Sequence, residues 1–168
     1  SAMFEGSSSS INVIGNFPPL KRPDPSINRY NARDMETLNK DVKRSPAEQS
    51  IHSHLTLVLQ SNQDYDGAFY SESSGYYVVA DPGAKISPKF DPKTRPYYSL
   101  AMARPGEMIL SRVYKGLRGN NVVVAARAFK DAEGEYSYVG GVAVNLNALS
   151  DKIASSKIGK TGYVALTE

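Results

Sequence analysis

Residues 121–145, NVVVAARAFKDAEGEYSYVGGVAVN, decide the fold class of this chain. Residues 121–130 and 135–145 are rich in valine, alanine and tyrosine, and each is a predicted strand. Between them, residues 131–134 supply the aspartate and the glycine that are typical of a turn. The two strands are therefore predicted to pair as antiparallel neighbours.

Three further strands are predicted before this pair. Residues 67–71 and 76–80 are joined by Glu72-Ser73-Ser74-Gly75, which is typical of a hairpin, and residues 108–114 form another strand. A short helix is predicted from Thr94 to Arg104, where a proline and a glycine follow and end it. The strands together predict a five-stranded antiparallel sheet.

Helices are predicted mainly in the first third of the chain. Ser45-Pro46-Ala47-Glu48 is a capping box with proline at the first helical position, and an apolar stripe follows from Ile51. Another helix is predicted over residues 34–43, and a last one over residues 148–156. The chain is thus predicted to be α+β, with helices packed on the sheet and N-terminal helices before it.

The two ends of the chain are expected to lie outside this domain. Residues 1–30 contain a serine run and four prolines, so they are predicted to form a tail that is flexible or draped over the domain. The opening Ser1-Ala2-Met3 is consistent with a cloning remnant. The domain itself is placed at residues 31–156, and residues 157–168 either start a second unit or add a strand.

Residues 90–98, FDPKTRPYY, form the candidate binding loop because they combine an arginine, three aromatic rings and two prolines. The Arg95 guanidinium can hold a carboxylate through two parallel hydrogen bonds, while neighbouring rings form an apolar slot. A plainer interpretation is that the prolines stiffen a surface loop and that Tyr97 and Tyr98 pack the first turn of a helix.

This loop resembles the FDPRxRPWY signature of double Cache domains, the extracytoplasmic sensor modules of bacterial chemoreceptors, histidine kinases and cyclic-dinucleotide enzymes. From about Tyr65 to Glu168 the chain is similar to the membrane-distal part of such a domain. The other landmarks are residues 111–114, 122–129, 131–134, 139–145 and 157–163. The resemblance implies a PAS-like topology and a two-component or chemotaxis receptor anchored in the inner membrane, with this part in the periplasm or outside the cell.

The resemblance also implies a set of ligand-binding residues. In amino-acid-binding members, the loop arginine and aromatic residues hold the ligand carboxylate, and two aspartates hold its ammonium. The matching positions here are Phe90, Arg95, Tyr97, Tyr98, Tyr114 and Asn145. Gly116 and Asn145 stand where the aspartates are expected, so the anion-binding half is retained and the cation-binding half is not. An ammonium without a carboxylate partner is costly to desolvate, which predicts a small carboxylate or other small anion without an amine as ligand.

Alternative interpretations stay open at this point. Arg95 could be structural, in a salt bridge or on carbonyl groups, and Asn145 could be a local cap. The domain could also be a ligand-free spacer or dimerisation module of such a receptor, which would make a homodimer. A dimer interface would need an apolar seam along the predicted helix over residues 34–43, where the apolar residues are few.

Composition excludes several other classes of protein. The chain has 168 residues and no cysteine, which rules out disulfides and thiolate metal sites. Its net charge of +3 gives little support to nucleic-acid binding. His52 and His54 are two apart on a predicted helix, the wrong spacing for shared metal ligation. No cofactor, metal or catalytic residue is expected, so the chain is not predicted to be an enzyme.

Overall fold

The computed structural model describes residues 4–147, 151 and 154. The helices are α1 (Ser7–Gly15), α2 (Pro46–Gln60) and α3 (Pro96–Ala103), with short 3₁₀ turns at Pro18–Lys21, Asn39–Asp41 and Pro92–Thr94. The strands are β1 (Thr37–Leu38), β2 (Tyr65–Glu72), β3 (Tyr77–Ala80), β4 (Lys85–Ile86), β5 (Ile109–Leu110), β6 (Tyr114–Lys115), β7 (Asn121–Lys130) and β8 (Tyr136–Asn145). The predicted helix over 148–156 and the predicted start of a second unit at 157–168 lie mostly or wholly outside the described residues.

The main sheet is antiparallel throughout, with strand order β3-β2-β8-β7-β5 and with β6 also paired to β7. The predicted central hairpin is confirmed, because β7 and β8 pair from Val122↔Asn145 to Lys130↔Tyr136. The predicted strand over 108–114 is instead two short strands, β5 and β6. Ser111 lies between them. Its backbone N–H still donates to the Val124 carbonyl (2.8 Å), but the Val124 N–H donates to the Ser111 hydroxyl (2.9 Å).

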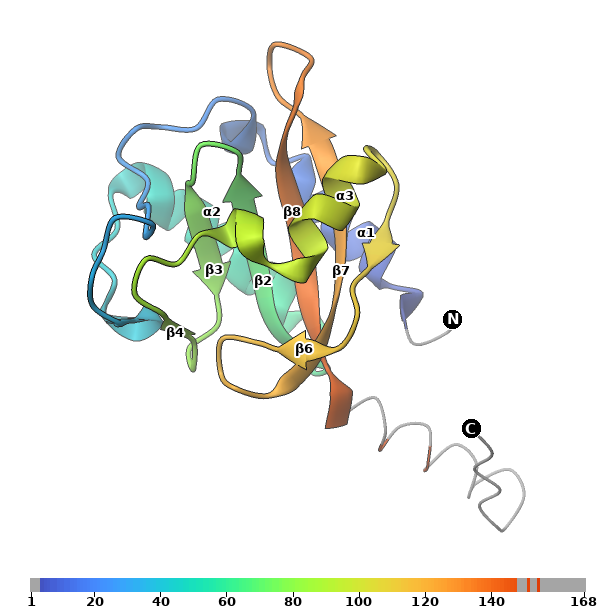
Figure 1. The fold of residues 1–168 in the computed structure, drawn as a ribbon. Coiled ribbons are helices and arrows are strands. Elements are labelled where there is room, and N and C mark those ends of the chain that lie inside the picture. The colour runs from blue at the N-terminus through green and yellow to red at the C-terminus, as the bar shows by residue number, and fades with distance from the viewer. Residues whose placement is uncertain (1–3, 148–150, 152–153, 155–168) are drawn as a thin grey trace.

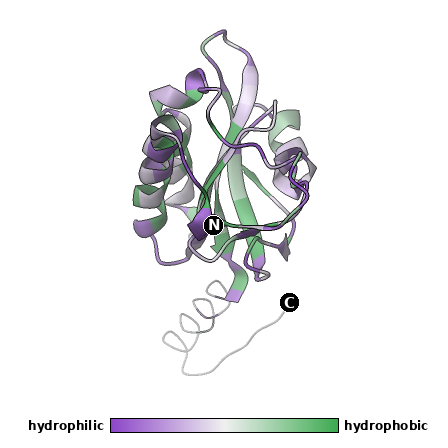
Figure 2. Cartoon of the chain, turned by 90° about the vertical axis from the view of Figure 1, so that its left-hand side faces the viewer, coloured by the Kyte–Doolittle hydropathy of each residue, from purple (hydrophilic) through white to green (hydrophobic). Residues whose placement is uncertain are grey.

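Helices cover both faces of this sheet, which confirms the predicted α+β class. Figure 1 views the sheet from the side of α3, with α1 and α2 on the far side. In Figure 2 hydrophobic residues are concentrated on the central strands, between the helical layers. Two apolar clusters result. One contains Ile11, Ile51 and Tyr70 on the side of α1 and α2, and the other contains Phe69, Tyr77 and Val124 on the side of α3.

Residues 1–30 are predicted to be flexible or draped over the domain; residues 7–15 instead form a regular helix, α1, which lies against the sheet. Ile11 and Ile14 are completely buried, and α1 packs against β7 and β8. Gly15 allows this approach, because a Cβ there would lie 2.0 Å from the Phe129 ring. The Tyr138 hydroxyl also donates to the Gly15 carbonyl (2.7 Å). The segment is ordered because it covers apolar side chains of the sheet.

The predicted helix over residues 34–43 is also wrong. Thr37–Leu38 is a strand paired with β4, and a 3₁₀ turn follows it. The buried Asn39 amide donates to the carbonyls of Val79 and Asp81, both at 2.9 Å, and so fixes this segment to the end of β3. Met35 in this segment is 79% exposed.

The predicted capping box correctly places the start of α2. The Ser45 hydroxyl accepts from the Glu48 N–H (3.1 Å), and Pro46 is the first helical residue. The Glu48 carboxylate does not return to Ser45. It accepts from the N–H of Asn28 (2.6 Å) and thereby attaches the preceding loop to the helix.

Candidate functional site

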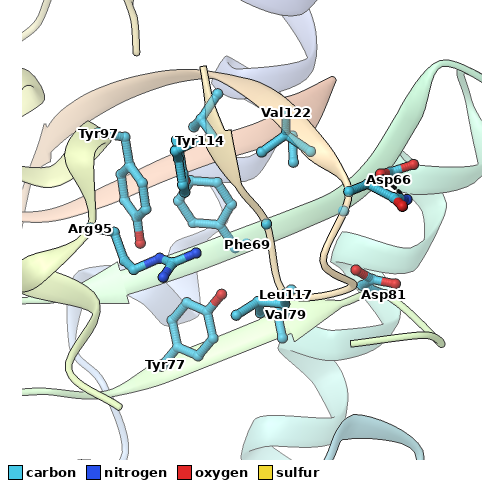
Figure 3. Close-up of a pocket in the computed structure, with 15 residues that line it drawn as sticks. Asp66, Phe69, Tyr77, Val79, Asp81, Arg95, Tyr97, Tyr114, Leu117 and Val122 are labelled. Carbon is cyan, nitrogen blue, oxygen red and sulfur yellow. Dashed lines mark hydrogen bonds between the residues drawn. The ribbon is translucent and has the colours of Figure 1, made fainter. Parts of the chain in front are cut away.

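A cavity of about 40 Å³ lies on the α3 side of the sheet. Its floor is formed by β2, β3, β7 and β8, and its cover by Arg95, Tyr97 and the turn between β6 and β7. Figure 3 shows these side chains. The lining residues are Asp66, Gly67, Phe69, Tyr77, Val79, Asp81, Arg95, Tyr97, Tyr114, Gly116, Leu117, Asn120, Val122, Val124 and Ala143.

Local loop chemistry positions Arg95 at one end of this cavity. Asp91 caps the 3₁₀ turn by accepting from the Lys93 N–H (3.0 Å), and the Thr94 hydroxyl donates to the Asp91 carbonyl (2.7 Å). Arg95 then has an extended backbone because Pro96 follows it and begins α3. The loop therefore holds the Arg95 side chain against the cavity rather than on the helix.

The Arg95 guanidinium lies among aromatic rings and one carbonyl. Its Nη2 donates to the Lys115 carbonyl (2.9 Å), and its Cζ lies 5.0 Å from the Tyr114 ring centroid and 5.6 Å from that of Phe90. A guanidinium has five N–H donors, more than this carbonyl can use. Arg95 can thus keep its position and still present donors to an anion.

Three tyrosines form the walls beside Arg95. Tyr97 and Tyr77 are buried, and the Tyr97 hydroxyl makes a 2.5 Å hydrogen bond with the Ser71 hydroxyl. Burial raises the pKa of all three phenols, Tyr77, Tyr97 and Tyr114, above the ordinary value, and the neighbouring Arg95 opposes part of this shift at each. The hydroxyls therefore remain protonated at neutral pH and can act as donors.

The structure brings Arg95, Tyr97 and Tyr114 together in the cavity lining, but it places the other predicted residues elsewhere. Phe90 lies behind Arg95, with its ring centroid 4.9 Å from that of Tyr77. Tyr98 is buried beside Tyr97 on α3 and is not part of the lining; burial raises its pKa to about 12. Asn145 at the end of β8 does not line the cavity either. It contacts a lining residue that the sequence did not suggest.

That residue is Asp66, one of two carboxylates in the lining that sequence reasoning missed. The Asn145 amide donates to both Asp66 oxygens, at 3.2 and 3.0 Å, and the Asn120 amide donates to one of them at 3.3 Å. Asp66 lies in the Asn-Gln-Asp-Tyr-Asp-Gly segment, residues 62–67, which imitates a calcium loop. This sequence pattern indicates a turn, and it does not indicate that Asp66 lines a pocket.

Asp81 is the second such carboxylate, and it has a cationic partner. Arg118 Nε donates to Asp81 Oδ1 at 2.6 Å, and the Gly83 N–H donates to the same oxygen at 3.0 Å. Burial raises the pKa of the Asp81 carboxyl, while the Arg118 guanidinium opposes part of this shift. Asp81 thus serves to fix the β6–β7 turn as well as to line the cavity.

The β6–β7 turn, residues 116–120, closes over the cavity through contacts at several points. The Leu117 carbonyl accepts from the Lys85 N–H (3.1 Å), and Arg118 reaches Asp81. Gly116, where the resemblance expects an aspartate, contributes only backbone to the lining. The apolar side chain of Leu117 lies over the middle of the cavity (Figure 3).

The described residues supply no other obvious chemistry. Among them, no group of three or more His, Asp and Glu side chains is arranged to hold a metal ion. Within the same part of the chain, no helix has both the length and the hydropathy needed to cross a bilayer. The cavity has a guanidinium at one end, phenols beside it and carboxylates at the other end.

Sequence comparison identifies bacterial chemotaxis receptors. The chain is 27% identical over 130 residues to the methyl-accepting chemotaxis protein McpB of Bacillus subtilis, covering 76% of this chain and 19% of McpB. TlpB of the same organism is 28% identical over 136 residues, covering 79% of this chain and 19% of TlpB. The chain thus spans about a fifth of these relatives. No family model matches it.

Structural comparison gives the same class of protein. The ligand-binding domain of the Pseudomonas fluorescens chemoreceptor CtaA, solved with L-alanine, has a TM-score of 0.64 at 21% identity, over 92% of this chain and 56% of that one. The ligand-binding domain of Campylobacter jejuni Tlp3, solved with 4-methylisoleucine, has a TM-score of 0.65 at 13% identity, over 91% and 54%. This chain therefore has the fold of bacterial chemoreceptor ligand-binding domains, and its sequence relatives are methyl-accepting chemotaxis proteins.

Proposed function

We propose that this chain is an extracytoplasmic sensor domain of a membrane-anchored bacterial receptor and that it binds a small carboxylate, or another small anion, at Arg95. The observation that carries the proposal is the cavity itself, in which a guanidinium with donors to spare lies between buried tyrosines. A carboxylate there would form charge-assisted hydrogen bonds beside aromatic and apolar walls.

We further propose that the chain is the membrane-distal unit of a double Cache domain. It covers little more than half of the CtaA and Tlp3 ligand-binding domains, which supports one of two units. Membrane attachment and a position in the periplasm or outside the cell follow from the same resemblance. Those two domains were solved with amino acids, so their ligands carry a carboxylate that an arginine could hold.

Signalling would follow from the contacts that Arg95 makes without ligand. The Lys115 carbonyl and an incoming carboxylate both use guanidinium donors, so a bound ligand would favour one arrangement of Arg95 and of the neighbouring β6 strand. A ligand shifts such an equilibrium only by its difference in affinity for the two arrangements.

The test is a thermal-shift series with acetate, butyrate, pyruvate and succinate on the wild type, Arg95→Ala and Arg112→Ala. Arg112 is a matched control because it is an exposed arginine near the same helix that does not line the cavity. A bound carboxylate at a hundred times its dissociation constant should add about 2.7 kcal/mol of stability. We expect this gain in the wild type and in Arg112→Ala, and its loss in Arg95→Ala.

The opposite result would favour the alternative in which the domain is a ligand-free spacer or dimerisation module. If no carboxylate stabilises the wild type and Arg95→Ala is itself destabilised, the hydrogen bond from Arg95 to the Lys115 carbonyl is structural. The domain would then be a spacer or dimerisation module, and its oligomeric state should be measured next.

A further inference from the structure

The charges that line the cavity do not match a simple anion. Asp81 is neutralised by Arg118, its ion-pair partner at 2.6 Å. Of the other lining side chains, all of which lie in the described part of the chain, Arg95 is cationic and Asp66 is anionic. A carboxylate ligand would satisfy Arg95 and leave Asp66 facing the same cavity. A ligand with one charge of each sign would match both.

A β-bulge directs Asp66 toward the cavity. Tyr65 pairs with Val144 and Gly67 pairs with Ala143, so Asp66 is the extra residue on β2. Regular alternation would place residue 66 on the same face as Ala68 and Tyr70, which pack in the cluster of α1 and α2. Bulges are frequent beside binding sites because they redirect a single side chain.

Two amides hold the Asp66 carboxylate in place without using all of its acceptor capacity. The Asn145 and Asn120 side chains donate to it at 3.0 to 3.3 Å. An ionised carboxylate offers about four acceptor positions, so it can still accept hydrogen bonds from an ammonium. Gly116 and Asn145 stand where the resemblance expects aspartates, but Asn145 supports the Asp66 carboxylate on another strand.

The two charged ends of the cavity are separated by apolar side chains. Figure 3 shows Arg95 and Asp66 on opposite sides, with Phe69 and Leu117 between them. Along β2, Asp66 and Phe69 are three residues apart, which is about 10 Å of strand. The amine and the carboxylate of an α-amino acid are attached to the same carbon atom, so with the carboxylate on Arg95 the α-ammonium stays at the Arg95 end of the cavity. An ω-amino carboxylate carries them at the two ends of an apolar chain.

We infer that Asp66 is the cation-binding end of this cavity and that the ligand is an ω-amino carboxylate, with its carboxylate on Arg95 and its ammonium on Asp66. The methylene chain lies against Phe69 and Leu117. This inference rests on the proposed function, since it adds a second contact to the carboxylate at Arg95. It makes Asp66 a specificity-determining residue.

Titration calorimetry with matched probes tests the inference on this domain. The ω-amino carboxylates are γ-aminobutyrate, δ-aminovalerate and ε-aminocaproate. Their α-amino isomers are α-aminobutyrate, norvaline and norleucine. Their amine-free analogues are butyrate, valerate and caproate. The proteins are the wild type, Asp66→Asn and Asp34→Asn. Asp34 is a control because it is an exposed aspartate that does not line the cavity.

For the wild type and Asp34→Asn we expect at least one ω-amino carboxylate to bind about tenfold more tightly than both its α-isomer and its amine-free analogue. In Asp66→Asn this preference should disappear while the affinity for the amine-free carboxylate stays within about twofold. Circular dichroism of Asp66→Asn would show whether the fold is intact.

Several outcomes would overturn the inference. Equal or tighter binding of the α-isomers would do so, as would an ω-amino preference that survives in Asp66→Asn. If amine-free carboxylates bind through Arg95 and an amine brings no gain, the inference fails and the proposed function stands. If none of the nine probes binds the wild type, the inference fails, and the thermal-shift series with acetate, pyruvate and succinate decides the proposed function separately. If Asp66→Asn does not fold, Asp66→Glu should keep an ω-amino preference and favour a shorter chain, and loss of that preference would again reject the inference.

Discussion

The two faces of the central sheet are covered in different ways. On one face, α1 and α2 bury an apolar cluster that contains Ile11, Ile14 and Leu55. On the other face, one short helix, loops and the β6–β7 turn cover a second apolar cluster, and this face also holds charged groups and a cavity. Dense apolar packing supplies most of the stability of a domain, whereas polar groups inside a cavity supply recognition. Both faces therefore contribute buried apolar side chains to stability, and the cavity with its charged groups lies on the α3 face.

The largest effect is expected from a change on the helical face. Ile14→Ala removes a completely buried side chain of α1 and should lower the free energy of unfolding by about 2–5 kcal/mol. Val13→Ala is the control. Val13 precedes Ile14 on the same helix, but its side chain is 52% exposed, so this change should alter stability by less than about 0.5 kcal/mol. Urea denaturation measures both, and a small effect of Ile14→Ala would show that α1 is not part of the cooperative fold.

A smaller effect is expected at the turn over the cavity. Arg118→Ala removes the partner of the buried Asp81 carboxylate and should cost about 1–3 kcal/mol at neutral pH. Burial already raises the pKa of Asp81, and the loss of Arg118 raises it further. Since protonated Asp81 no longer needs a cation, the difference in stability from the wild type should shrink as the pH falls through that pKa. Denaturation curves between pH 7 and about pH 4 test this, and a pH-independent difference contradicts it.

The smallest effect is expected for the hydroxyl pair beside Arg95. Tyr97→Phe leaves the buried Ser71 hydroxyl without its 2.5 Å partner and should cost about 1–2 kcal/mol. Ser71→Ala in the Tyr97→Phe background should add little, because it removes the unsatisfied group. A double-mutant cycle measures the coupling, and additive losses would show that the two hydroxyls act separately.

Strong local patterns made much of the fold predictable. The β7–β8 hairpin and α2 were recognised because turn chemistry and a capping box mark their ends. The helix predicted over 34–43 failed because Asn39 makes tertiary hydrogen bonds that a periodic pattern does not reveal. α1 was missed because serine has little helix preference of its own, and the helix depends on burying Ile11 and Ile14.

The candidate site was predictable only in part, for a similar reason. The loop chemistry and the resemblance indicated Arg95, and the structure places Arg95 in the cavity lining together with Tyr97 and Tyr114. Asp66 could not be predicted in the same way, because its direction depends on the pairing register of β2 with β8. A register shift is a relation between two distant segments and leaves no pattern in either one alone.

The bulge at Asp66 gives chains of this kind a route to new ligands through insertion and deletion. Deletion of Asp66, the one residue between Tyr65 and Gly67, would restore regular pairing and remove the carboxylate from the cavity. Residues 67–72 could keep their partners on β3 and β8. Related receptors could therefore gain or lose the response to an amine in one step that leaves Arg95 and its loop untouched. When such sequences are aligned, a single gap at the start of this strand would be more informative about the ligand than many substitutions elsewhere.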